Sequence, residues 1–261
     1  MATPAPVRSG FRITGPDVPS AAYAHPPLVE SWLGVDFAAN GQLTESDFDA
    51  LHATLGPEWP SPWKEVSIDS SPPELQVTNV MGDRALRVTA HGFAFGWLGY
   101  TGERYPRYEA VRDGFVAVFD SLRTLAGRDR MPFIPQRWSV QYRNRIPRGT
   151  VWSKPGEWAF FKLWQPAVLK GLGTDPAGFQ AKWQLPLEAE RGNLAIEFRH
   201  VIPQTDDETE CAWLNLTTSG PVDNADASLF DGLDYGREVI IRSFNELVSA
   251  DAKTYWGVRP R

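Results

Sequence analysis

The sequence predicts an α+β fold: a mostly antiparallel sheet covered by two long amphipathic helices. Several segments alternate apolar and polar residues with the period of two that is typical of half-buried strands. Two other segments repeat apolar residues every three or four positions, as amphipathic helices do. The strand-like segments occur in runs before each of these helices, and this order favours antiparallel pairing over a parallel sheet.

Composition restricts the class of protein. The chain has 261 residues, and 26 Lys and Arg stand against 32 Asp and Glu, for a net charge of −6. A general nucleic-acid binder would carry a basic excess instead. Cys211 is the single cysteine, which excludes an intrachain disulfide framework and a Cys-rich zinc module. No apolar run approaches the roughly 18 residues that a membrane span needs, and the first residues lack the apolar core of a secretory signal. We therefore expect a cytoplasmic globular protein.

The first half of the chain is expected to hold strands, a short helix and a long helix. Residues 1–22 are rich in Pro, Ala and Ser and predict a flexible arm. A short helix should follow Thr44 and end before Gly56. The long helix is expected over 105–126, where apolar residues form a continuous stripe. Alternation predicts strands over 28–37, 64–68, 74–80, 84–91 and 93–100.

The second half repeats this general order. The clearest strand is expected over 137–146, and residues 147–178 read as irregular. The second long helix is expected over 233–250. Further strands are predicted over 183–189, 194–202 and 212–218. We therefore expect a single unit over 23–261 with two sub-blocks, 23–130 and 131–261, on a loosely duplicated plan.

Three segments together resemble a known family. Residues 25–31 (HPPLVES) resemble an opening of the type PPIVEA, and residues 142–146 (YRNRI) resemble a strand of the type RYxNRI. The stretch from Leu233 to Gly257 resembles a closing helix that begins with Leu-Asp and ends with Trp-Gly. This ordered set is similar to a sporadically distributed family of uncharacterised bacterial proteins of about this length. Gly236 and Arg237 depart from its pattern, which often has a His there. The resemblance implies a bacterial protein and a fold, but no catalytic residues.

The usual chemical signatures are missing from the sequence. There is no GxSxG nucleophile elbow, no phosphate-binding glycine loop, and no pair of histidines at metal-ligand spacing. We therefore expect neither a cofactor nor a metal. Glu188 and Glu190 lie two apart in a predicted strand, where they could share a proton or a cation, or face solvent.

The best candidate site is a strand face that carries three arginines: Arg137, Arg143 and Arg145. All three share one parity of the strand, and no acidic residue does. Either acids from neighbouring strands, with Glu188, Glu190 and Glu197 the first choices, or a bound anion should offset them. Asn144 lies on the opposite, apolar parity, where it should bond backbone or orient a ligand. His91 and His200 are the histidines that could join this site.

Two function classes follow from these observations. The first is a non-enzymatic binding or adaptor protein with a protein partner, favoured by the aromatic content of 12% and the arginine face. The second is an enzyme or sensor that binds an anionic small molecule through Arg143 and Arg145. A homodimer whose helices pack together is a third option. A deep pocket where arginines and histidines converge would favour the second class.

Overall fold

A computed structural model describes residues 22–38, 45–59, 64–67, 74–100, 102, 104–126, 134–164, 178–203, 209–223 and 226–259. The predicted arm lies outside these residues except for its last position. Ala22 and Tyr23 form strand β1 (Ala22–Tyr23), which pairs antiparallel with β11 (Val258–Arg259) near the C-terminus.

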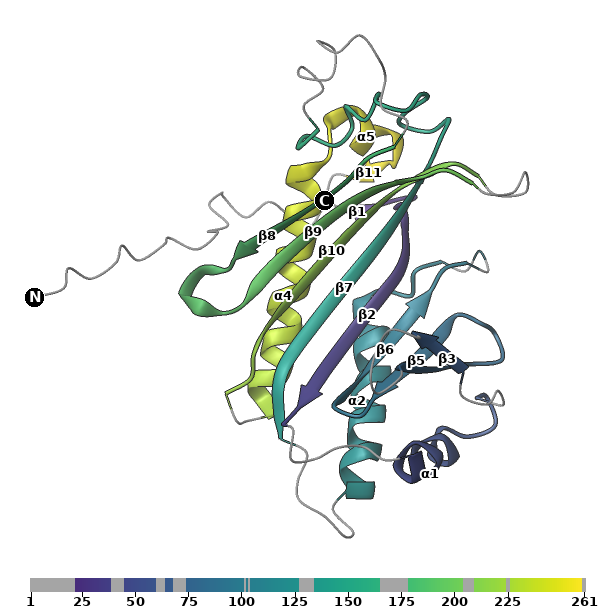
Figure 1. Cartoon of the computed structure of the whole chain (residues 1–261), viewed down its shortest axis with the longest axis vertical. Coiled ribbons are helices and arrows are strands. Elements are labelled where there is room, and N and C mark those ends of the chain that lie inside the picture. Colours follow the sequence, from purple (N-terminus) through teal and green to yellow (C-terminus); the bar gives the residue numbers. More distant parts are fainter. Residues whose placement is uncertain are drawn as a thin grey trace, which may run out of the picture.

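Nine of the described strands form one sheet in the order β3-β4-β5-β6-β2-β7-β10-β9-β8 (Figure 1). All of its neighbouring pairs are antiparallel. The predicted α+β class with an antiparallel sheet is therefore confirmed. The strands are β2 (Leu28–Phe37), β3 (Lys64–Ser67), β4 (Glu74–Thr78), β5 (Arg84–Thr89), β6 (Gly92–Leu98), β7 (Pro135–Pro147), β8 (Gln180–Pro186), β9 (Asn193–Val201) and β10 (Cys211–Pro221).

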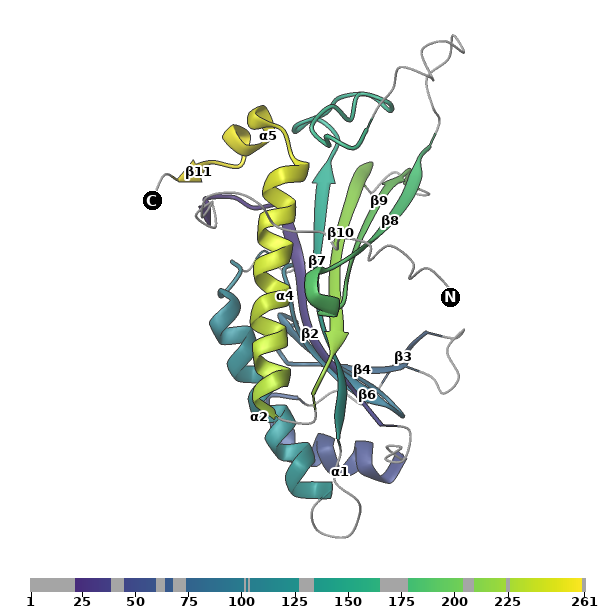
Figure 2. The ribbon, with the colours of Figure 1, turned by 90° about the vertical axis from the view of Figure 1, so that its left-hand side faces the viewer.

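Two long helices pack on this sheet. Helix α2 (Tyr108–Ala126) contacts β6 and β2, and helix α4 (Asp226–Leu247) contacts β7 and β10. Figure 2 shows both helices on the same side of the sheet. Helix α1 (Glu45–Leu55) packs against α2, and α5 (Ala250–Tyr255) follows α4. None of the helices in the described part of the chain is both long and apolar enough to cross a bilayer.

The long helices differ from their predicted bounds for local reasons. Helix α2 begins three residues later than expected because Arg107 has a φ of 79°, outside the helical region. Helix α4 begins earlier, at Asp226, because Leu229 and Leu233 are both buried and extend its apolar face toward the N-terminus. It ends at Leu247, and Ser249 then caps α5 by accepting a hydrogen bond from the backbone N–H of Ala252.

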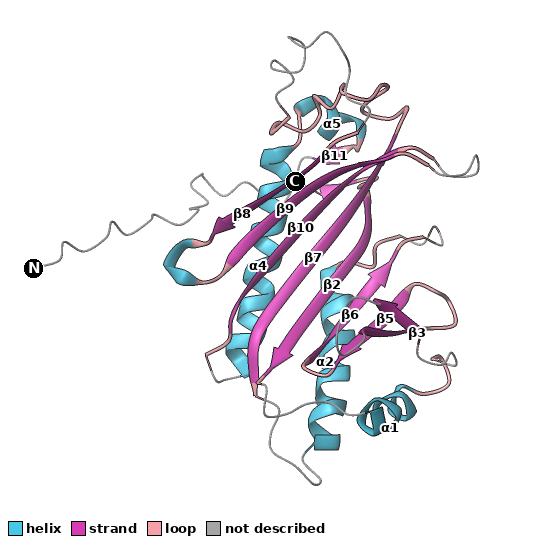
Figure 3. Cartoon of the chain, viewed as in Figure 1, coloured by secondary structure: helices cyan, strands magenta, loops and turns pink. Residues whose placement is uncertain are grey.

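Aromatic side chains fill much of the core. Among the described residues, eight tryptophans are buried: Trp32, Trp59, Trp97, Trp138, Trp152, Trp158, Trp164 and Trp256. The irregular segment 148–164, drawn as loop at one end of the sheet in Figure 3, contributes three of these tryptophans together with Phe160 and Phe161. Phe161 stacks on Phe198 of β9 with ring centroids 4.8 Å apart. Packing thus accounts for most of the aromatic residues.

Candidate functional site

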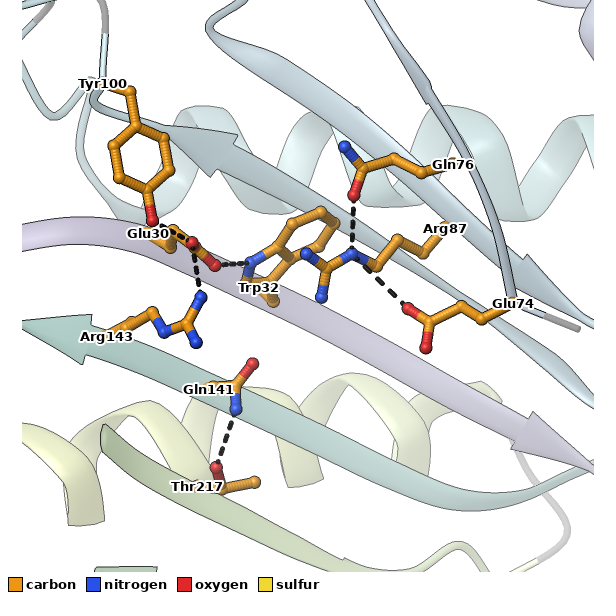
Figure 4. Close-up of polar contacts among 9 residues, drawn as sticks. All are labelled: Glu30, Trp32, Glu74, Gln76, Arg87, Tyr100, Gln141, Arg143 and Thr217. Carbon is orange, nitrogen blue, oxygen red and sulfur yellow. Dashed lines mark hydrogen bonds and ion pairs between the residues drawn. The ribbon is translucent and has the colours of Figure 1, made fainter. Parts of the chain in front are cut away.

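The side of the sheet that faces away from α2 and α4 is polar. On β7, buried side chains alternate with half-buried or exposed ones, and the buried set includes Trp138 and Tyr142. Gln141 and Arg143 belong to the other set, which shares its side of the sheet with Glu30 of β2 and Thr217 of β10 (Figure 4). We call this surface the polar face.

Glu30 is the centre of the polar face. Its carboxylate accepts a hydrogen bond from Trp32 Nε1 at 2.8 Å and from Arg143 Nη1 at 2.9 Å, and it accepts another from the hydroxyl group of Tyr100 (Figure 4). Burial alone would raise the pKa of Glu30, but these hydrogen bonds and the charge of Arg143 outweigh it and lower the pKa. The side chain is therefore a buried, ionised carboxylate held by donors on three sides.

Arg87 forms a second arm of this cluster. Its guanidinium lies over the ring of Trp32, 3.9 Å from the ring centroid. Its Nε donates to Gln76 Oε1 at 2.8 Å and lies 3.4 Å from a carboxylate oxygen of Glu74 (Figure 4). Trp32 is consequently covered by Arg87 and is only 3% exposed, although it lies on the polar face.

Trp213 of β10 makes the second cation–aromatic contact of this cluster. The guanidinium carbon of Arg143 lies 4.8 Å from the centroid of its ring. In the strand register Trp213 faces Arg145 of β7 on one side and Arg199 of β9 on the other. Arg145 and Arg199 form no ion pair with any residue that the structure describes. Arg145 instead directs Nη2 toward the backbone oxygen of Thr209, at 3.5 Å.

Two other acids of the sheet face cations in the strand register. Asp36 of β2 faces Arg137 of β7, and Glu197 of β9 faces Lys182 of β8. Burial raises the pKa of Asp36 despite the nearby charge of Arg137. Arg137 also donates to Ser219 Oγ at 2.6 Å. Arg145 and Arg199 are thus the cations beside Trp213 that form no ion pair with a described residue, whereas Arg143 pairs with Glu30.

The structure does not bring the six predicted site residues into one place. Arg143 and Arg145 lie at one end of β7, and Arg137 lies at the other end, by strand rise about 20 Å from Arg143 and about 26 Å from Arg145. His91, in the turn between β5 and β6, lies near Asp36 at this second end.

The remaining two residues lie on the opposite side of the sheet. His200 is buried beside Trp152, and its Nε2 is 2.7 Å from Glu210 Oε1. Asn144 is buried as well, and its Nδ2 donates to the backbone oxygen of Leu214 at 3.0 Å. A ligand-binding role for this predicted set stays a prediction, and the structure offers three separate locations for it.

The acid that offsets Arg143 is not one of those expected. Glu188 and Glu190 lie in a 3₁₀ turn, both exposed, because β8 ends at Pro186 and the chain turns through positive φ at Ala189 and Glu190. Arg143 pairs with Glu30 instead. The alternation of β2 places Glu30 on the outer parity, but the sequence carries no signal that β2 and β7 are neighbours.

Comparison of the chain with models of known protein families and with curated proteins finds no match. Within the described ranges, no three His, Cys, Asp or Glu side chains gather in a group that could hold a metal ion.

Proposed function

We propose that the protein is a non-enzymatic binding or adaptor protein that receives an acidic partner segment on its polar face. The observation that carries this proposal is the row Arg145, Trp213, Arg199, in which two arginines without an ion pair among the described residues flank a half-buried indole. Guanidinium groups bind carboxylates through paired hydrogen bonds, and tryptophan and arginine are the residue types most enriched at binding hot spots.

The surrounding cluster supports a preorganised surface. Glu30 holds Arg143, and Glu74 with Gln76 holds Arg87, so these side chains already occupy fixed positions over Trp213 and Trp32. Binding to such a surface loses less side-chain entropy than binding to free arginines. Because both held arginines are neutralised internally, Arg145 and Arg199 supply the charge available to a partner.

An extended segment suits this surface better than a compact ligand does. Polar side chains continue across neighbouring strands from Arg143 to Asn215, and from Gln141 to Thr217. They offer hydrogen bonds along a broad sheet rather than around one point. The Oδ1 atom of Asn215 is buried without a partner among the described residues and would accept a donor from the partner chain.

The same cations also favour the second class, a site for an anionic small molecule at Arg143 and Arg145. One carboxylate or phosphate could bridge Arg145 and Arg199 beside Trp213. Under this alternative small anions bind tightly, and a longer acidic ligand binds with no higher affinity. The two proposals therefore differ in how affinity depends on the length of the ligand.

Fluorescence anisotropy with a labelled peptide of ten glutamates tests the proposal, with citrate and inorganic phosphate as competitors. We expect salt-dependent binding that the variant Arg145→Gln/Arg199→Gln loses. The matched control is Lys154→Gln/Lys162→Gln, which removes two charges from exposed lysines outside the polar face. Equal binding by both double variants would overturn the proposal. Full displacement by millimolar citrate would favour the small-molecule class.

We also infer a duplicated plan in which α2 and α4 each close one block and together cover one face of the sheet. The strand order supports this inference. In the first block the opening strand, β2, lies beside the last strand, β6, and in the second block β7 lies beside β10. The other strands follow outward from both pairs.

We place the protein in the bacterial cytoplasm, as the sequence predicts.

A further inference from the structure

A second surface lies where α1, α2 and the turn between β4 and β5 meet. These elements enclose a cavity of about 430 Å³, within the size range of about 300–1,000 Å³ that is usual for ligand sites. Figure 1 shows α1 beside the lower end of α2, away from β10. This cavity is therefore separate from the polar face.

Small residues on α2 create the cavity. Ala110, Gly114, Ala117 and Ser121 follow one another at intervals of four, three and four residues, so they share one side of the helix. A Cβ atom at Gly114 would lie only 2.4 Å from the ring of Phe95. Phe95 and the neighbouring ring of Trp59, with centroids 6.2 Å apart, form an apolar floor.

Apolar surface continues outside the cavity. Val80 and Met81, in the turn between β4 and β5, are 62% and 63% exposed. The backbone N–H of Val80 donates to the backbone oxygen of Glu58 at 2.8 Å, and Glu58 itself lines the cavity. The turn therefore holds two exposed apolar side chains close to the cavity mouth, as interaction surfaces do.

Acidic side chains flank this apolar area, and the cation Arg84, which lines the cavity, pairs with Asp83, with Nη1 2.8 Å from Oδ2. Glu58 is exposed, and α2 presents the exposed residues Glu109, Asp113 and Asp120 next to its small-residue side. These four form no ion pair with any described residue. Arg112 does not offset them, because it points to Asp234 of α4, with Nε 3.1 Å from Oδ1. The stretch from Glu109 to Asp120 covers about 16 Å of helix.

We propose that this cavity is the docking site for a basic amphipathic helix of a partner protein, which inserts one large apolar side chain between α1 and α2. Charge complementarity requires lysine or arginine on the occupant. The length of the acidic stretch matches two to three turns of a partner helix. Val80 and Met81 lie outside the cavity, so a small molecule bound inside it would leave them uncovered, whereas a helix could cover them. This site would give an adaptor its second partner, but it does not depend on the polar face.

Fluorescence anisotropy with designed peptides tests the proposal on the full chain. The probes are three 14-residue helical peptides that carry lysines and an apolar stripe of leucines. They differ in the residue at the centre of the stripe, which is Leu, Phe or Trp. A scrambled peptide of the same composition is the control. We expect the amphipathic peptides to bind at least roughly tenfold more tightly than the scrambled one. Equal binding would show nonspecific charge attraction and would overturn the proposal.

Variants of the protein then locate the site. Ala117→Trp should fill the cavity mouth and weaken binding by roughly tenfold, whereas Thr124→Trp, on the same helix but outside the cavity lining, should not. Asp113→Lys/Asp120→Lys should weaken binding, and the control Asp231→Lys/Glu246→Lys on α4 should not. Binding that is insensitive to both Ala117→Trp and the α2 charge reversal would overturn the proposal. The variant Arg145→Gln/Arg199→Gln should lose binding of the glutamate peptide but still bind the amphipathic peptides, so the two proposals are tested separately.

Discussion

Glu30 and Arg143 face each other across strands β2 and β7, with Arg143 Nη1 2.9 Å from Glu30 Oε1, although 113 positions separate them in the chain. The two side chains are unequally placed, since that of Glu30 is 4% exposed and that of Arg143 is 40% exposed. Removal of the carboxylate charge therefore leaves an arginine that water can reach, whereas removal of Arg143 leaves a buried anion.

Glu30→Gln should lower the free energy of unfolding by about 1–3 kcal/mol, the usual effect of losing buried hydrogen bonds to a charged group. Chemical denaturation measures the change. Glu238→Gln is the control, because Glu238 forms an exposed pair with Arg242 on α4 and should change stability by less than about 1 kcal/mol. Equal effects of the two substitutions would contradict a stabilising role for the Glu30 cluster.

The contribution of Glu30 should depend on pH. The folded state lowers the pKa of Glu30 below its ordinary value of 4.5, so the unfolded state binds this proton more tightly. The stabilisation is therefore fully present above pH 4.5 and is lost as the pH falls through the lowered folded pKa. Denaturation curves of the parent and Glu30→Gln should differ by a constant amount near neutral pH and converge in acid. A difference that grows in acid would contradict this sign.

Phe115→Ala should cost about 3–5 kcal/mol, because it opens a cavity in the core under α2. Phe115 is fully buried and stacks on Phe93 of β6 with centroids 4.9 Å apart. Val116→Ala is the control, since Val116 is only half-buried on the same helix. Thermal and chemical unfolding of both variants measure the difference, and similar stabilities would contradict the packing of α2 on the sheet.

Gly236→Ala should destabilise the protein by about 1–3 kcal/mol through overpacking, although alanine normally favours a helix over glycine. A Cβ atom at Gly236 would lie 2.6 Å from Thr218 Oγ1 and 2.6 Å from the ring of Trp138. Gly178→Ala is the control, because nothing lies within 4 Å of its Cβ position. A gain in stability at Gly236 would mean that α4 can move away from the sheet at little cost.

Local patterns in the sequence determined the elements themselves. The alternation over 137–146 predicts β7 and assigns Arg143 and Tyr142 to opposite sides, as the structure has them. The apolar stripe over 105–126 predicts α2, which begins at Tyr108. These features are local, because the side-chain period of a strand or helix depends on neighbours within a few residues.

Only the tertiary structure decided which elements meet. The sequence placed Glu30 on the outer side of its strand and could not show that β2 lies beside β7. It also could not show that Trp213 would stand between Arg145 and Arg199, or that His200 would be buried on the opposite side of the sheet from these two arginines. Strand order and register depend on the packing of segments that lie far apart in the chain, and no local period records that packing.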